Sequence, residues 1–373
     1  MRNILFTMLS IVMFLGYSCS DSQKHIVKND LLEYDTISIP IDYPYVSFYY
    51  TSSLYAKNDT VLWAGYNHLT HSIDFVDITH QRPMGSLNLD DEGPNAIFKN
   101  QIGSFVFNDS LIVFKDFSNN LKFYSRMDGV ICRKVTLFPS DEDWNSTYIG
   151  VLPGQFNNGF SMRLCGDMIV LPVFSKKESR MDDVIATSVN VRNFMVEHLN
   201  IHYPEIMKED LERYGSLTYP CLTISSDRIV YNFPYSSRVY SYLLDENKIE
   251  TLSLDSRMTG NLSASKPKME KRDARRNFDY ENMSLRFGET YYDEKSDSYI
   301  RIHYDKKESP FEEEKSYLMC YNCKTQQITE YSLPSCFSTR YYVNDGFVYF
   351  LLKNNSDDYL HFASINIEML FSL

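Results

Sequence analysis

A short signature recurs six times along this chain at nearly equal intervals. Each copy places a Ser or Thr at the start of a strand-like run, and successive copies lie 57, 57, 57, 66 and 54 residues apart. Repeats of this length that consist of β-strands are typical of β-propellers. The period therefore predicts an all-β fold, a six-bladed β-propeller. The six copies are centred on Ser47, Ser104, Ser161, Thr218, Ser284 and Ser338.

The second repeat shows the expected strands most clearly. Polar turns separate three apolar runs, Leu111–Phe114, Leu121–Tyr124 and Val130–Phe138. β-branched and aromatic residues in such runs favour strands, and Asp128-Gly129 supplies the positive φ that a tight hairpin needs. The other repeats fill in similarly, so we expect four strands in each blade.

The last repeat is one strand short. It contains strands at Gly346–Leu352 and Tyr359–Ile367, whereas Glu33–Ile41 near the other end of the chain belongs to no repeat. Pairing that segment with the last blade would close the ring and leave no unpaired strand edge at the seam. We therefore expect a single propeller domain, residues 31–373, closed by an N-terminal strand that completes the last blade.

Composition agrees with a large β protein and excludes one class of partner. Hydrophobic residues make up 43% of the chain, with 29 Tyr and 24 Phe, which supplies an ample core. The formal net charge is −12, whereas nucleic-acid binding needs a basic surface. We expect a monomer with no nucleic-acid partner.

The first residues carry an export signal. Arg2 precedes the apolar run Ile4–Leu15, which is typical of a secretory signal peptide and too short to span a membrane as a mature helix. Cys19 follows directly, in a context that resembles a bacterial lipobox. The resemblance implies a signal peptide at residues 1–18, a lipidated Cys19, a flexible tether to residue 30 and an outer-membrane anchor. A plain signal peptide is the alternative.

Loop lengths distinguish the two faces of the expected propeller. Turns from first to second strand are short in most blades, whereas connections on the opposite face are long. Insertions on one face of a repeat array usually mark a binding face, although they could also only cover the channel mouth. The long connections are Pro139–Asn158, Ser175–Asp183, His202–Ser216, Asp255–Asn282 and Asp305–Lys315.

Three arginines occupy matching positions in the repeats. Arg163, Arg286 and Arg340 each follow the signature by two residues, so we expect them at equivalent heights beside the central channel. Converging guanidinium groups favour a carboxylate- or sulfate-bearing ligand; alternatively, each pairs with an acid or carbonyl of a neighbouring blade. Aromatic residues nearby suit sugar or peptide recognition. The aromatic candidates are Tyr49 and Tyr219 near the ring, and Trp144 and Tyr148 in the long loops.

Metal, cofactor and catalytic signals are weak. Cys320-x-x-Cys323 lacks the second pair of a zinc ribbon, and His68-x-x-His71 lacks a third ligand. The chain contains no Gly-x-Ser-x-Gly elbow, P-loop or His-Glu-x-x-His motif. We therefore predict no cofactor, no metal site and no catalytic residue. The six cysteines beyond Cys19 could form disulfides, but their spacing gives no framework.

One segment resembles a known group. Asn88–Ile97 (NLDDEGPNAI), followed by Phe105–Asp109 (FVFND), is similar to six-bladed β-propeller lipoproteins of Bacteroidales, a TolB-like or NHL-like group in which Glu-Gly-Pro often joins two blades. The resemblance implies export, a lipid anchor and a propeller, and it implies no catalytic residue. Much of that group has no known function.

These observations predict an exported, lipid-anchored propeller that binds a small molecule, glycan or peptide on its long-loop face. Two other classes remain open. A propeller-type lyase or hydrolase would need a polar cluster at the channel mouth, and a scaffold for an envelope protein complex would show an exposed apolar patch. The fold alone does not separate them.

Overall fold

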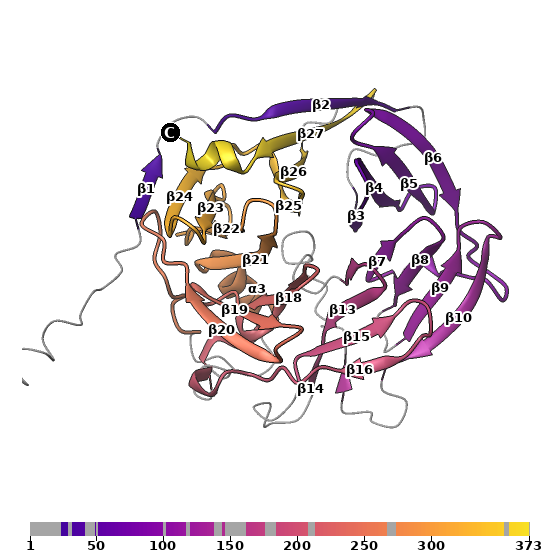
Figure 1. Ribbon diagram of the computed structural model, residues 1–373, viewed down its shortest axis with the longest axis horizontal. Helices are drawn as coiled ribbons and strands as arrows, with labels where there is room; N and C mark the ends of the chain where they lie inside the picture. Colours follow the sequence, from indigo (N-terminus) through magenta and orange to yellow (C-terminus); the bar gives the residue numbers. More distant parts are fainter. Residues whose placement is uncertain are drawn as a thin grey trace, which may run out of the picture.

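The protein forms a ring of six antiparallel four-stranded sheets around a central axis (Figure 1). The sequence prediction of an all-β, six-bladed propeller is therefore confirmed. The computed structural model describes residues 24–28, 32–41, 49, 51–99, 102–116, 120–137, 144–145, 162–175, 184–207, 213–266, 274–353 and 358–372.

Each blade runs from an inner strand beside the axis to an outer strand at the rim. Blade one comprises β3 (Ser52–Lys57), β4 (Thr60–Asn67), β5 (Ser72–Asp77) and β6 (Arg82–Asn88). Blade two comprises β7 (Ser104–Phe107), β8 (Leu111–Lys115), β9 (Asn120–Ser125) and β10 (Val130–Thr136). Blade three comprises β12 (Arg163–Cys165), β13 (Met168–Pro172), β15 (Ala186–Asn190) and β16 (Val196–His198).

The second half of the ring repeats this order. Blade four comprises β17 (Cys221–Ile224), β18 (Arg228–Asn232), β19 (Arg238–Leu243) and β20 (Lys248–Ser253). Blade five comprises β21 (Arg286–Asp293), β22 (Ser298–Tyr304), β23 (Ser316–Asn322) and β24 (Gln327–Ser332). Blade six comprises β25 (Phe337–Asn344), β26 (Phe347–Leu352), β27 (Tyr359–Asn366) and, outermost, β2 (Asp35–Pro40).

The last blade is completed by the N-terminal part of the chain, as predicted. β2 pairs antiparallel with β27 from Asp35 opposite Ser364 to Pro40 opposite Tyr359. Ile39 is fully buried, together with Trp63 of blade one and Phe362 of blade six, so the closing strand also contributes to the core at the seam. The seam therefore has both a continuous hydrogen-bond ladder and a continuous apolar core.

A fifth strand covers the rim of blade five. β1 (Lys24–Lys28) pairs in parallel with β24, from Lys24 opposite Gln327 to Lys28 opposite Tyr331. The sequence interpretation places these residues in a tether, whereas their backbone extends a sheet. Other outer strands expose most of their residues, but Thr329 and Glu330 of β24 are fully buried.

Six apolar clusters hold the ring together, one at each interface between neighbouring blades. The sheet faces pack on each other, so each blade buries residues on both sides. This arrangement explains why the inner and middle strands are apolar on alternate and often on consecutive positions. Aromatic contacts such as Tyr49 with Trp63, with ring centroids 4.9 Å apart, are part of these interfaces.

The two faces of the ring differ as the loop lengths predict. Turns from first to second strand lie on one face, the tight-turn face, and include positive-φ residues such as Asn58, Asp345 and Gly346. The opposite, long-loop face carries α3 (Ala274–Met283), η2 (Glu205–Met207) and η3 (Gly215–Thr218), and the two-stranded ladder of β11 (Trp144–Asn145) with β14 (Phe174–Ser175). η4 (Glu368–Phe371) follows β27.

In two blades the predicted strand start is wrong. Blade one begins at Ser52, so Tyr49 lies outside the strand, and blade four begins at Cys221 because Thr218 ends the 3-10 helix η3. The rest of the first signature and Ser161 lie outside the described residues. In the other blades the inner strand begins within two residues of the signature.

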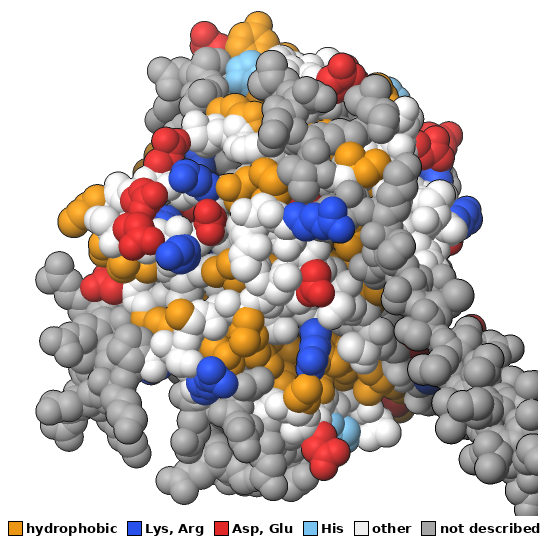
Figure 2. Space-filling view, turned by 90° about the vertical axis from the view of Figure 1, so that its left-hand side faces the viewer, with side chains coloured by type: hydrophobic (Ala, Val, Ile, Leu, Met, Phe, Trp, Pro, Cys, Tyr) orange, Lys and Arg blue, Asp and Glu red, His pale blue; other side chains and the backbone are white. Residues whose placement is uncertain are grey.

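The outer surface is chemically mixed. Hydrophobic, acidic and basic side chains are interspersed over the described part of the face in Figure 2. Within the described ranges, no helix has both the length and the apolar character needed to cross a membrane.

Candidate functional site

Two cavities lie at opposite ends of the ring. The first, the channel cavity, has a volume of about 630 Å³ and is enclosed by all six inner strands at the tight-turn face. The second, the long-loop pocket, has a volume of about 850 Å³ and lies between blades four and five on the other face. Both volumes fall in the range of small-molecule sites.

A buried ion pair forms the floor of the channel cavity. The Arg163 guanidinium of β12 pairs with the Glu289 carboxylate of β21, across the ring from blade three to blade five. The Glu289 side chain is 1% exposed and that of Arg163 is 14% exposed. Burial, the largest single effect, would lower the pKa of Arg163, but the Glu289 charge, the hydrogen bond to Glu289 and the nearby Tyr291 and Tyr342 together raise that pKa, so the guanidinium stays charged.

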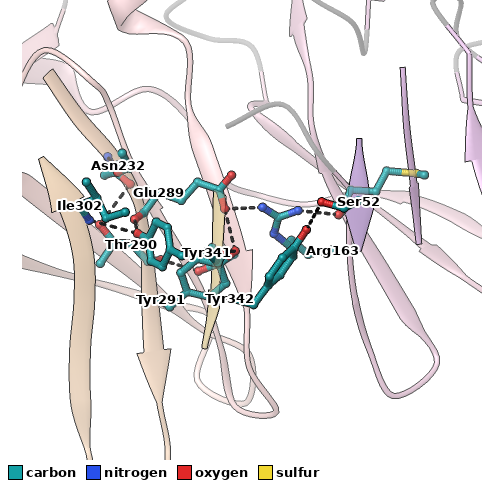
Figure 3. A network of polar contacts seen from close by, with 12 residues as sticks. Ser52, Arg163, Asn232, Glu289, Thr290, Tyr291, Ile302, Tyr341 and Tyr342 are labelled. Atoms are coloured by element: carbon teal, nitrogen blue, oxygen red, sulfur yellow. Dashed lines mark hydrogen bonds and ion pairs between the residues drawn. The ribbon is translucent and has the colours of Figure 1, made fainter. Parts of the chain in front are cut away.

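Tyrosines surround this ion pair (Figure 3). The Tyr291 hydroxyl donates to Glu289 Oε2 at 2.9 Å and lies 3.2 Å from the Tyr341 carbonyl. The Tyr341 hydroxyl donates to the Glu289 carbonyl, and Tyr342 shares a 2.7 Å hydrogen bond with Ser52. The network therefore connects blades one, three, five and six.

A bulge in β21 places Glu289 at this point. The pairing of β21 with β22 shifts between Phe287 and Thr290. A Cβ on Gly288 would lie 3.1 Å from the Ile302 carbonyl oxygen, so glycine permits the close approach of the two strands. The Gly288 carbonyl in turn accepts a 2.9 Å hydrogen bond from Asn232 of blade four.

The three predicted arginines do not form one ring. Arg163 is at the channel floor, and Arg340 lies close enough for its charge to be felt by Glu289, but its guanidinium donates to the Tyr49 carbonyl at the seam. Burial lowers the pKa of Arg340. Arg286 pairs instead with Glu314 on the long-loop side. All three bond to acids or carbonyls of the protein, which is the structural alternative raised from the sequence.

The predicted aromatic residues that the structure describes are parts of the core. Tyr49 is 1% exposed and donates to Asp74 at 2.9 Å, and Tyr219 is 8% exposed just after η3. Both precede their inner strands, and neither lines the channel cavity. Trp144 is described only through its backbone, which pairs with Ser175. Tyr148 and Cys19 lie outside the described residues.

The long-loop pocket has an apolar wall. It lies between the connection at residues 260–265, the end of α3 and the β22–β23 loop. The apolar residues of its wall are Leu262, Ala264, Tyr280, Met283 and Leu285. The polar residues are Ser265, Asp279, Ser284, Asp305, Lys306, Lys307 and Glu308. Two of the five long connections predicted from the sequence, Asp255–Asn282 and Asp305–Lys315, therefore contribute to a cavity on the long-loop face.

A buried charge cluster separates this pocket from a smaller one. Lys307 lines both the long-loop pocket and a neighbouring cavity of about 210 Å³. Its Nζ lies 3.7 Å from Glu314 Oε1, and Glu314 also pairs with Arg286. The side chains of Lys307, Glu314 and Arg286 are 7%, 12% and 2% exposed. Two buried cations thus share one carboxylate.

α3 brings a titratable group to the same region. Glu281 is 5% exposed and accepts a hydrogen bond from Ser216. Burial raises the pKa of Glu281 to about 7, although Lys266 opposes the shift. The carboxyl group therefore changes charge near neutral pH.

Sequence reasoning missed Glu289 and Lys307. Glu289 had a signal, because it is an acid in the interior of an inner strand, RFGETYYD. Lys307 had no such signal in the sequence, because it follows Lys306 in a polar loop and becomes buried only in the tertiary structure.

Cysteine and metal chemistry add no second site in the described part of the chain. The six cysteines found there are free thiols, and Cys320 is buried in the core between blades five and six. Within the same residues, no three His, Cys, Asp or Glu side chains form a group that could hold a metal ion.

Comparisons with known proteins agree on the fold. The family described as "Domain of unknown function (DUF4221)" matches residues 25–331. A Bacteroides vulgatus structure of that family has a TM-score of 0.68 and 18% identity, covering 91% of this chain and 100% of that one. A Bacteroides fragilis structure, named as an exported protein, has a TM-score of 0.54 and 11% identity, covering 92% and 99%. No curated protein matches the sequence.

Proposed function

The chain belongs to the DUF4221 family, whose name assigns no activity, and we propose that it is an exported propeller that binds an amphiphilic acid in its long-loop pocket. Such a ligand has an apolar body, such as an acyl chain, and a carboxylate or phosphate at one end. The observation that carries this proposal is an apolar cavity whose inner wall includes Lys307.

The apolar wall favours the body of the ligand. Burial of apolar surface contributes roughly 25 cal/mol per Å², or about 0.8 kcal/mol for each CH₂ group. Leu262 is 53% exposed and lines the pocket, so a ligand can remove apolar protein surface from water there. Polar groups near the wall then fix the orientation of the ligand.

Charge favours an acidic head group at the inner end. Lys307 and Arg286 both pair with Glu314, so two buried cations lie beside this carboxylate. Lys306 and Glu308 pair with each other at 3.1 Å with side chains 70% and 80% exposed, so solvent screens their charges. Buried charges are screened much less, and they therefore decide the preference.

Matched eight-carbon probes test the proposal. We expect octanoate to bind the purified protein in calorimetry more tightly than octanol or octyltrimethylammonium. Lys307→Met should remove the preference for the acid while octanol binding persists, and Leu262→Asp should weaken binding of all three. Equal binding of the three probes would contradict the acid site. Absence of binding by all of them would leave the protein-scaffold alternative as the better explanation.

We include export and a lipid anchor in the proposal. The signal-like residues 1–18, the lipobox-like position of Cys19 and a fold neighbour named as exported support this location. Labelling of cells with a radioactive fatty acid tests the anchor. Wild-type protein should be labelled and Cys19→Ser should not; equal labelling of the two would exclude Cys19 as the lipid site.

A further inference from the structure

We propose that the channel cavity is a second binding site, which takes a neutral polyhydroxylated ligand such as a short glycan. This site is independent of the long-loop pocket, because the two cavities share no lining residue and open on opposite faces. The proposal concerns the tight-turn face, which the loop lengths did not mark as a binding face.

The wall of the cavity is formed by paired strands. Its wall contains segments of β3, β7, β12, β17, β21 and β25, the inner strands of all six blades. Binding to a wall of paired strands requires little ordering of the protein, which lowers the entropic cost of binding.

Charged groups at the mouth are already paired within the protein. Arg192 pairs with Asp167 at 2.7 Å, and Lys295 pairs with Asp345 at 2.9 Å. Because each of these ions has a partner of opposite charge, a charged ligand finds no uncompensated charge among them.

The two remaining acids at the mouth accept backbone hydrogen bonds. Asp293 accepts from the backbone N–H groups of Ser296 at 2.8 Å and Gly346 at 2.9 Å. Glu294 accepts from the Ser226 N–H at 2.7 Å. These carboxylates are thereby stabilised where they are, which again favours a ligand without net charge.

The floor presents two side chains that the protein holds in place. Arg163 and Tyr291 line the cavity, and both bond to Oε2 of Glu289, which itself does not line the cavity. Glu289 therefore acts on a ligand through the positions of Arg163 and Tyr291. A ligand hydroxyl meets these two side chains directly or through one water molecule.

Four tyrosines give the wall the mixed character that sugars need. Tyr55, Tyr291, Tyr292 and Tyr342 line the cavity from blades one, five and six. The Tyr292 hydroxyl donates to Asp297 at 2.8 Å and the Tyr342 hydroxyl bonds to Ser52, so these two rings are held in place. Fixed aromatic rings present apolar faces next to hydroxyl groups, which matches the alternating C–H and O–H surface of a sugar.

Calorimetry with trisaccharides tests the second site. The neutral probes are linear trisaccharides of glucose, mannose, galactose and xylose; a glucosamine and a uronic acid trisaccharide are the charged controls. We expect at least one neutral probe to bind. Asn344→Ala at the cavity wall should weaken it about threefold to tenfold, and Glu289→Gln should weaken it about tenfold.

Two controls separate this site from the proposed function. Leu262→Asp in the long-loop pocket should leave trisaccharide binding unchanged, and both channel variants should bind octanoate like the wild type. Urea unfolding confirms that each variant is folded. Absence of binding by every neutral probe overturns the proposal, as does binding that survives in both Asn344→Ala and Glu289→Gln, or that occurs only with the charged probes.

Discussion

The two cavities show how one ring provides two very different binding environments. Inner strands form the channel cavity, and its charged groups are paired or accept backbone hydrogen bonds. Connections between strands form the long-loop pocket, whose wall has an apolar part and also contains Lys307, which pairs with Glu314 together with Arg286. Strands that must pack in a closed ring have to satisfy their polar groups internally, whereas loops are free to leave chemistry for a ligand. Three sets of variants test this contrast.

The largest effect is expected at the channel floor. Glu289→Ala leaves the Arg163 cation buried without its carboxylate and should lower the free energy of unfolding by about 3–5 kcal/mol, measured by urea denaturation. The double variant Arg163→Met/Glu289→Met should recover most of that loss, because the buried charges are then both absent. As a matched control at the long-loop pocket, Glu308→Ala should leave the unfolding midpoint unchanged. A small effect of Glu289→Ala would show that the ion pair does not hold the ring.

An intermediate effect is expected from Glu281, which supports the long-loop pocket. Because burial raises its pKa from 4.5 to about 7, the folded state binds the proton more tightly than the unfolded state. Its contribution to stability is therefore full below pH 4.5 and is lost as the pH rises towards 7, by on the order of 3 kcal/mol. Glu281→Gln should remove this loss. Denaturation at pH 5 and pH 8 checks it: parallel pH dependence in wild type and variant would contradict the assignment.

The smallest effect is expected at the rim of the channel cavity. Lys295 and Asp345 pair at 2.9 Å, but their side chains are 52% and 68% exposed. Exposed ion pairs contribute little to stability, so Lys295→Ala should leave the urea midpoint and octanoate binding unchanged. A clear destabilisation would mean that the tight-turn rim, like the channel floor, depends on its charges.

The sequence predicts the fold well because the interval between successive signatures corresponds to one four-stranded blade. The signature near Ser104, Ser284 and Ser338 marks inner strands correctly, and Glu33–Ile41 contains the closing strand β2. The signature fails near Tyr49 and Thr218, where residues before the strand carry a similar pattern. Patterns of hydrophobicity report which residues are buried, but they do not distinguish a strand from the segment that leads into it.

The residues of the candidate site are predicted less well, because the direction of each side chain depends on the local register of its strand. Arg163, Arg286 and Arg340 share a sequence position, yet the strands β21 and β25 each contain a register shift near their start. A shift of one residue turns a side chain to the other face of its sheet. The sequence predicted the face on which the long-loop pocket lies but not the residues that form it. Lys307 and Glu314, for example, come together only through the tertiary fold.

The parallel pairing of β1 also determines the face of the propeller at which the chain enters this strand. Lys24 lies opposite Gln327, and Gln327 follows a turn on the tight-turn face, so the chain enters β1 at that face. In the lipid-anchored form that we propose, the lipid on Cys19 is five residues before Lys24 and would therefore lie on the side of the tight-turn face. In that orientation the channel cavity would face the membrane surface and the long-loop pocket would face the aqueous compartment.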